Sequence, residues 1–213
     1  MLRLSLAVIY LTASTTVQKK FCHYLINNNY LIIFLMDITE FVELSLGRWR
    51  SQRSVHHLAF RHFEQVTSTI DIEPIDSSDK AIIELCKIHQ IEPKLASSAF
   101  RMTWEGESDW DEDEVTQGST ILVPIPNRSD RTKGILLREQ GYAETIPAVG
   151  NYTISADGTF ILHTKYQRAT AEEKIWFAMP NLRFRVSSIK TSEGTGVVTA
   201  SFSSEIRSLA SNN

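Results

Sequence analysis

Polar and apolar residues alternate with a period of two through much of the chain from residue 49 onward. Between residues 49 and 57 this alternation sets Arg53 and His57 on the same face as Trp49, as expected for an extended strand. A second strand is expected over residues 62–74. Other short runs of branched and aromatic residues, bounded by turn-forming residues, predict strands over residues 99–104, 119–123, 134–138, 142–145, 151–155, 159–166, 174–178, 182–190 and 196–206.

In two segments the apolar residues recur at helical spacing and not with the period of two. Residues 37–46 repeat apolar side chains at helical spacing behind Asp37, which caps a helix, and Gly47 ends the segment. Residues 77–88 predict a second capped helix, with Cys86 on its apolar side. About ten antiparallel strands with one or two short helices predict a mainly β, closed or nearly closed barrel, because a long open sheet would expose its edges.

Local motifs add detail to this barrel. Asp157-Gly158 predicts a two-residue hairpin, and residues 192–196 predict a looser turn. Gly47-x-Trp49, with Arg207 near the end of the last strand, is similar to the pattern of lipocalins and fatty-acid-binding proteins. In that pattern an arginine covers the tryptophan and closes the base of the barrel.

The first 35 residues differ from the rest. They contain no acidic residue and have neither a helical nor an alternating period, and neither of their apolar runs reaches the roughly 20 residues that cross a bilayer. We interpret residues 1–35 as an upstream extension translated in error, with Met36 as the start; a disordered or targeting segment is the alternative. The functional domain is then expected over residues 36–208, with a tail over residues 209–213.

Charge and cysteine content exclude several classes of function. The net charge of -3 argues against nonspecific nucleic-acid binding, which needs clustered cations. Cys22 and Cys86 are the only cysteines, so no disulfide framework is expected, in agreement with a reducing compartment. No cysteine and histidine spacing indicates zinc, and the acidic residues 109–113 are not followed by the glycine and glutamate of a calcium loop. No metal site is expected.

Five segments together resemble the S-type phycobiliprotein lyases of the CpcS/CpeS family, over about Met36 to Arg207. They are residues 47–60, 104–111, 141–144, 176–185 and 204–207. The resemblance implies a lipocalin-like or fatty-acid-binding-protein-like antiparallel barrel that binds a linear tetrapyrrole, phycocyanobilin or phycoerythrobilin, and attaches it through a thioether to a cysteine of a phycobiliprotein subunit. It implies the bilin as substrate, no cofactor, no membrane, and a location in the cyanobacterial cytoplasm or the plastid stroma.

Two other functions stay open from the sequence. One is a noncatalytic lipocalin-type carrier of a small apolar ligand. The other is the accessory subunit of a two-protein lyase, in which a paralogue is the partner; a homodimer is also compatible with the resemblance. The sequence identifies neither the bilin nor the acceptor subunit.

Arginines are the first candidates for the substrate site, because guanidinium groups bind propionates. Arg53 lies among apolar neighbours on its strand face and therefore needs an anionic partner, either Glu205 or a ligand carboxylate. Arg183 and Arg185 point to one side of their strand. Such alternating arginines are more often a solvated outer face, but the resemblance implies contact with the propionates.

Histidines and a carboxylate are the candidates for catalysis. His56 and His57 are adjacent, so a regular strand sends them to opposite faces, and only one faces a cavity unless a bulge intervenes. The resemblance implies a role in bilin binding for both, as a proton donor or positioning group; the alternative is a hydrogen-bonded core residue. Glu205 is expected to pair with pyrrole nitrogens or with Arg53.

Aromatic residues are the candidates for contact with the rings of the substrate. Trp104 and Trp110 match positions tied to chromophore binding in the family, although large aromatics at a strand end are usually core residues. Tyr142 is a further substrate-binding candidate.

Overall fold

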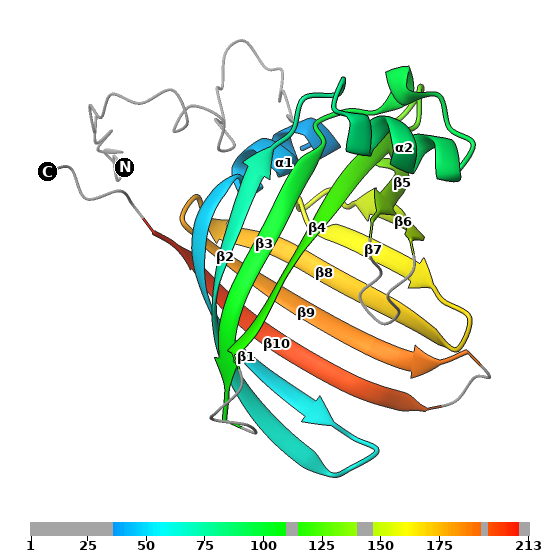
Figure 1. Cartoon of the computed structure of the whole chain (residues 1–213). Coiled ribbons are helices and arrows are strands. Elements are labelled where there is room, and N and C mark those ends of the chain that lie inside the picture. The colour runs from blue at the N-terminus through cyan, green and yellow to red at the C-terminus, as the bar shows by residue number, and fades with distance from the viewer. Residues whose placement is uncertain (1–35, 110–114, 140–146, 193–195, 209–213) are drawn as a thin grey trace, which may run out of the picture. The chain divides into compact units, whose positions relative to one another are not determined.

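The structure, a computed structural model, describes residues 36–109, 115–139, 147–192 and 196–208. In these ranges ten antiparallel strands form one closed barrel, in which each strand pairs with its neighbours in sequence and β1 pairs with β10 (Figure 1). The strands are β1 (Gly47–His57), β2 (His62–Pro74), β3 (Phe100–Ser108), β4 (Val115–Pro126), β5 (Lys133–Arg138), β6 (Ala148–Ile154), β7 (Phe160–Lys165), β8 (Ala169–Met179), β9 (Leu182–Thr191) and β10 (Val197–Arg207). The predicted mainly β barrel is confirmed.

Helix α1 (Ile38–Ser45) closes one end of the barrel. Asp37 caps it by accepting hydrogen bonds from the backbone N–H groups of Thr39 and Glu40. The apolar side of α1 packs into the barrel, where Phe41 stacks on Phe160 at a centroid distance of 4.4 Å. Among the residues that the structure describes, the apolar core inside the barrel is therefore concentrated at this end.

Helix α2 (Lys80–Ile88) covers the outer face of β4 and β5. Its buried side chains pack on Ile121, Val123 and Leu137, while the alternate residue Leu122 packs inside the barrel. This explains why β4 is apolar on both faces over residues 121–125. Cys86 lies on the buried side of α2. Burial raises the pKa of its thiol, as expected for an inert cysteine.

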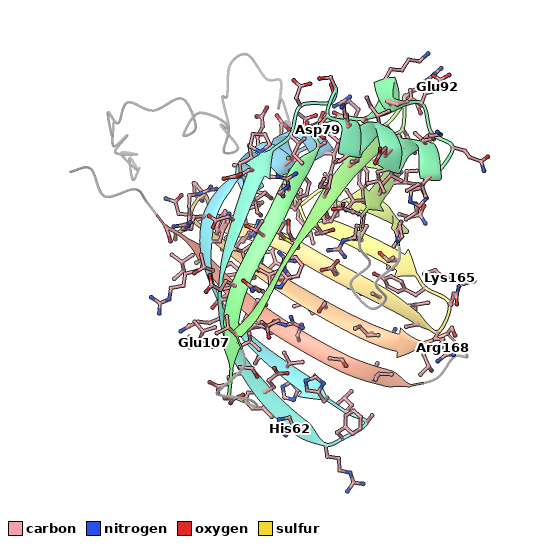
Figure 2. The ribbon with its side chains drawn as sticks, viewed as in Figure 1. His62, Asp79, Glu92, Glu107, Lys165 and Arg168 are labelled. Carbon is pink, nitrogen blue, oxygen red and sulfur yellow. The ribbon has the colours of Figure 1, made fainter. Side chains whose placement is uncertain are left out.

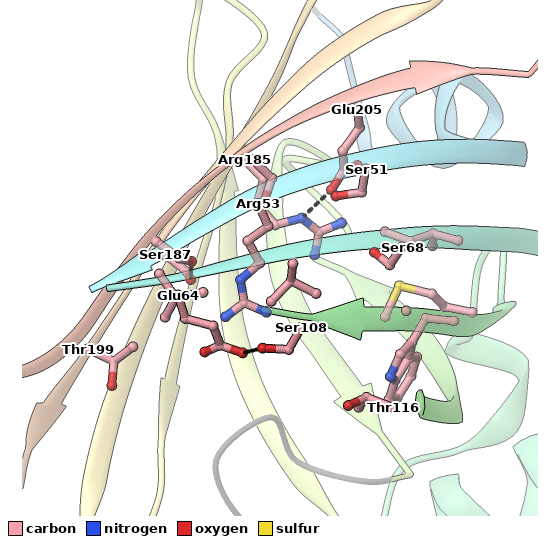
Figure 3. A pocket seen from close by; sticks show the side chains of 18 of the residues that line it. Ser51, Arg53, Glu64, Ser68, Ser108, Thr116, Arg185, Ser187, Thr199 and Glu205 are labelled. Atoms are coloured by element: carbon pink, nitrogen blue, oxygen red, sulfur yellow. Dashed lines mark hydrogen bonds and ion pairs between the residues drawn. The ribbon is translucent and has the colours of Figure 1, made fainter. Parts of the chain in front are cut away.

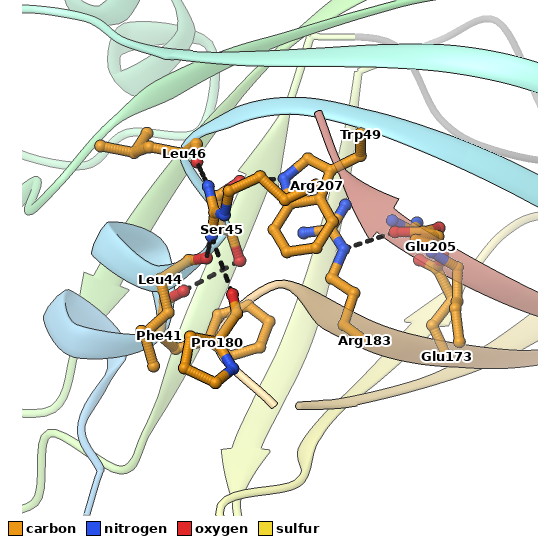
Figure 4. Close-up of polar contacts among 11 residues, drawn as sticks. Phe41, Leu44, Ser45, Leu46, Trp49, Glu173, Pro180, Arg183, Glu205 and Arg207 are labelled. Carbon is orange, nitrogen blue, oxygen red and sulfur yellow. Dashed lines mark hydrogen bonds and ion pairs between the residues drawn. The ribbon is translucent and has the colours of Figure 1, made fainter. Parts of the chain in front are cut away.

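Trp49 and Arg207 close the base of the barrel, as the sequence pattern predicts (Figure 4). The Arg207 guanidinium lies 4.2 Å from the centre of the Trp49 ring and donates hydrogen bonds to the backbone carbonyls of Leu44, Leu46 and Pro180. The Trp49 indole N–H donates to the carbonyl of Ser45 at 2.8 Å. These bonds tie the end of α1 to the first and last strands.

We expect Arg207→Met to lower the free energy of unfolding by about 2–3 kcal/mol, because a charged donor to three carbonyls is lost. Arg50→Met is the matched control, since Arg50 is exposed on the outer face of β1. Urea unfolding followed by tryptophan fluorescence measures both. Equal stability of the two variants would contradict this role of Arg207.

One turn differs from its prediction. Between β6 and β7 three residues, not two, separate Ser155 from Thr159, which share a backbone hydrogen bond of 3.0 Å. The Asp157 side chain accepts from the N–H of Thr159, and Gly158 takes φ +82°, so the side chain and the glycine together fix the longer turn. The predicted strand over residues 142–145 and most of the predicted turn over residues 192–196 lie outside the described residues.

No helix within the described ranges is long and apolar enough to span a bilayer.

Candidate functional site

The barrel interior beyond the base contains a cavity of about 490 Å³ (Figure 3). This volume lies within the range of small-molecule sites. The wall comes from seven strands and combines apolar, hydroxyl and charged side chains. The lining residues are Ser51, Arg53, Val55, His57, Glu64, Val66, Ser68, Ile70, Met102, Trp104, Gly106, Ser108, Thr116, Thr120, Arg138, Arg185, Ser187, Ile189, Thr199, Ser201, Ser203 and Glu205.

The cavity exists because inward positions become small beyond the base. On β1 the inward residue Trp49 is followed by Ser51, and on β10 Glu205 is followed by Ser203 and Ser201 toward the other end of the barrel. Ser201 is also hydrogen-bonded to Ser187 of β9, at 2.7 Å between their hydroxyl oxygens. Hydroxyl groups on this wall leave space and offer hydrogen bonds to a polar ligand.

Trp104 of β3 supplies a flat apolar surface in a part of the wall away from the serines of β9 and β10. A Cβ atom at Gly118 would lie 2.3 Å from the Trp104 ring, so the indole occupies the space that a side chain on β4 would fill. Met102, two residues before Trp104 on β3, and Ile70, its partner on β2, extend the apolar surface next to the indole. A conjugated ligand can stack on such a surface.

A buried ionic cluster lies between the cavity and the apolar base (Figure 4). Glu205 accepts hydrogen bonds from the Nε atoms of Arg183 and Arg185, the latter at 3.1 Å. Glu173 binds Arg185 at 3.5 Å and Arg138 at 3.4 Å. These contacts link β5, β8, β9 and β10 across the interior.

Electrostatics keep Glu205 ionised. Burial would raise the pKa of Glu205, but the charges and hydrogen bonds of Arg185 and Arg183 lower it below its ordinary value. Burial lowers the pKa of Arg183 to about 10, which still leaves its guanidinium protonated at neutral pH. The cluster therefore presents a fixed carboxylate and fixed cations to the cavity.

A second polar group lies near the end of the barrel away from α1, where the β1–β2 hairpin marked by His62 extends (Figure 2). His57 Nε2 lies 2.6 Å from one oxygen of Glu64, and Ser108 donates to the other oxygen at 2.6 Å. Burial would raise the pKa of Glu64, but these two hydrogen bonds and the charge of Arg53 lower it. Arg53 and Glu64 both point into the cavity (Figure 3).

The residues that line the barrel interior include more positive than negative side chains. The residues that line the main cavity and a smaller cavity of about 50 Å³ beneath it include four arginines and three glutamates. The arginines outnumber the glutamates, and in a low-dielectric interior this positive excess favours an anionic ligand. The charged residues are Arg53, Arg138, Arg183 and Arg185 against Glu64, Glu173 and Glu205.

The structure brings five of the predicted site residues to the main cavity. They are Arg53, His57, Trp104, Arg185 and Glu205. Arg183 faces inward but lies below the cavity, 1% exposed, with its guanidinium 4.3 Å from the Trp49 ring. It therefore supports Glu205 and does not line the main cavity. The solvated outer face considered for Arg183 and Arg185 is wrong, because both point inward.

His56 does not reach the cavity. Regular alternation of β1 places it on the outer face, exposed, with its ring 5.0 Å from the Phe63 ring. The expectation that only one of the two histidines faces inward is confirmed, and His57 is that residue. Trp110 and Tyr142 lie outside the described residues.

The prediction from the sequence did not include three charged residues of the interior, Glu64, Arg138 and Glu173. The signal that could have found them is the same alternation that located Arg53. Glu64 shares a face of β2 with Val66, and Glu173 shares a face of β8 with buried residues. In the described ranges no three histidine, cysteine, aspartate or glutamate side chains form a group that could hold a metal ion.

Several known proteins are similar to this chain over most of its length. The chromophore lyase CpcS/CpeS 3 of Trichodesmium erythraeum is 61% identical over 173 residues, which are 81% of this chain and 100% of that protein. The putative phycoerythrobilin lyase CpeS of Microchaete diplosiphon is 53% identical over 74% of this chain and 71% of that protein. The phycocyanobilin lyase subunit CpcS of Picosynechococcus is 39% identical over 76% and 83%, respectively.

A solved structure has the same fold. The S-type phycobiliprotein lyase CpeS from Guillardia theta superposes with a TM-score of 0.72 at 50% sequence identity, covering 82% of this chain and 94% of that one. A family model described as CpeS-like protein matches residues 37–208. The chain therefore belongs to the CpeS-like family.

Proposed function

We propose that this protein is a chromophore lyase that binds a linear tetrapyrrole inside the barrel and guides its attachment to a cysteine of a phycobiliprotein subunit. One observation carries the proposal: a member of the CpeS-like family has an open, ligand-sized cavity with an excess of arginine in its wall. Relatives named as chromophore, phycoerythrobilin and phycocyanobilin lyases support it.

The cavity matches the chemistry of a bilin. Its propionates need cationic partners, and the cavity wall offers guanidinium groups for them, among them Arg53 and Arg185 at one level of the barrel, on either side of Ser203. Its conjugated rings need flat apolar contacts, which Trp104 and Met102 supply. Its pyrrole nitrogens gain a proton easily, and the ionised Glu205 stabilises that positive charge.

The reaction is an addition. The thiol of the acceptor cysteine gives up its proton, and its sulfur bonds to the exocyclic ethylidene carbon of the bilin. One proton is delivered to the neighbouring ring carbon, so the double bond becomes single and the net change is addition of S–H. Atoms balance without an oxidant or reductant, and the proposal includes no metal and no nucleotide. The protein's contribution is to fix the conformation and the reacting face of the bilin.

His57 and Glu205 have different proposed roles. Protonation makes the ethylidene carbon more electrophilic, so a proton donor near the bilin accelerates the addition. The lowered pKa of Glu205 makes it an acceptor of hydrogen bonds from the protonated bilin, not an acid. His57, held by Glu64 on the cavity wall, is the proposed donor.

An accessory subunit of a two-protein lyase is the second candidate. One observation favours it: the relative from Picosynechococcus is named a lyase subunit. Such a subunit would bind the bilin in the same cavity and complete the reaction only with a paralogous partner.

Reconstitution with purified components tests the function. The protein is mixed with phycocyanobilin or phycoerythrobilin, then with an apo-phycobiliprotein subunit, with and without a paralogous lyase. Absorption spectra report binding, and mass spectrometry of acceptor peptides reports the bond.

A lyase gives a shifted visible band and one thioether adduct faster than the bilin and acceptor alone. An accessory subunit gives the adduct only with the paralogue, and a carrier gives the band without the adduct. No spectral change with either bilin would reject the proposed function.

A further inference from the structure

Arg138, the last residue of β5, lies at the boundary between the main cavity and the smaller cavity under α1. Its side chain is 5% exposed. No motif of the sequence singles it out, and β5 lies across the barrel from β1 in strand order. Arg138 therefore places a guanidinium at the floor of the cavity. It comes from the side of the barrel across from β1, the strand of Arg53.

Arg138 is incompletely paired. Its one ion pair within the described residues is with Glu173, at 3.4 Å between Nη1 and Oε2, and the other oxygen of Glu173 lies 3.5 Å from Arg185. The Nε–H of Arg138 makes no hydrogen bond with any residue that the structure describes. A buried donor left without an acceptor is unfavourable, so this nitrogen favours a ligand oxygen.

The charge of the floor supports the same inference. Arg138, Arg183 and Arg185 face two carboxylates, Glu173 and Glu205. Both oxygens of Glu205 are engaged by the arginines of β9, so Arg138 shares only the long contact to Glu173. One further carboxylate would neutralise the floor and satisfy the free donor.

We propose that Arg138 is a carboxylate-binding residue that holds one propionate of the ligand at the floor of the cavity. The inference rests on the proposed bilin substrate. The propionates of a bilin belong to its two central rings, and the reactive ethylidene carbon belongs to a terminal ring. Holding a central propionate at the floor turns the terminal rings toward the end of the barrel away from α1, where an acceptor thiol can approach.

Esterified ligand separates a carboxylate contact from a structural effect. Dissociation constants of phycocyanobilin and of its dimethyl ester are measured by absorption titration for the native protein and for Arg138→Met. We expect Arg138→Met to weaken binding of the free acid about tenfold or more, since a charged hydrogen bond is lost, and to leave binding of the ester nearly unchanged. Arg101→Met, an exposed position on β3, is the control and should bind both ligands as the native protein does.

Stability is followed in parallel, because Arg138→Met removes one partner of Glu173. If thermal unfolding shows that this variant is not folded, Arg138→Met combined with Glu173→Gln restores the charge balance and carries the same comparison.

Equal affinity of a folded variant for the free acid, or an equal loss for acid and ester, overturns the role of Arg138 and leaves the lyase proposal standing. A native protein that binds neither ligand overturns both.

Discussion

Replacing Ser203 with phenylalanine is expected to weaken bilin binding strongly while the barrel stays folded. Ser203 is 2% exposed on β10 and lies opposite Arg53 on β1 and Arg185 on β9. A phenyl ring here would fill the space between the two arginines. Because a close-packed wall cannot move aside, we expect the dissociation constant for phycocyanobilin to rise roughly 100-fold or more.

Ser204→Phe is the matched control, since the next residue of β10 faces outward between Gln52 and Phe184. It adds the same ring to the same strand and should bind bilin as the native protein does. Circular dichroism and thermal unfolding show whether both variants are folded. Native affinity in a folded Ser203→Phe variant would place the bilin outside the barrel interior.

Glu205→Ala is expected to destabilise the protein by about 3–5 kcal/mol, which is the usual effect of removing one partner from a buried ion pair. Glu205 and Arg183 are each 1% exposed, so the variant leaves the Arg183 guanidinium without its carboxylate in a dry environment. Urea unfolding measures the loss. Glu107→Ala, an exposed position on β3, should change stability by less than about 0.5 kcal/mol.

The pH dependence of stability gives an independent check on Glu205. Its pKa in the folded protein is lowered, so its contribution is complete above the unfolded value of about 4.3 and is lost as pH falls through the folded value. Glu205→Gln should therefore show a smaller loss of stability on acidification than the native protein. Part of the acid dependence remains, because the pKa of Glu64 is also lowered. Identical acid profiles would show that Glu205 is not held ionised.

Strand alternation accounts for much of what could be predicted. Period two set Arg53 and His57 on the Trp49 face and His56 on the other, and the structure has these faces. Glu205 and Arg207 share a face in the same way, and Arg207 covers Trp49 as its motif predicts. Such features depend on residues close in sequence, or on a pattern that recurs in many barrels.

The sequence could not predict how far from the base of the barrel an inward-facing side chain lies. Arg183 and Arg185 share one face of β9, yet Arg183 lies against Trp49 in the base while Arg185 lines the cavity. The two residues are two positions apart, so they point to the same side of β9 but lie at different heights along the barrel. Which of them reaches the cavity depends on the register of β9 with β8 and β10, and no local pattern specifies that register.

By itself, then, the sequence determined the barrel, the capped helices and the faces of the strands, because side chains alternate with a period that neighbouring residues set. Only the tertiary structure decided that Arg138, Glu173 and Glu205 meet in one ionic layer, and that Glu64 holds His57. These groups come from strands that lie far apart in sequence. Their distances depend on the closure and register of ten strands together, which fix where small residues leave the cavity open.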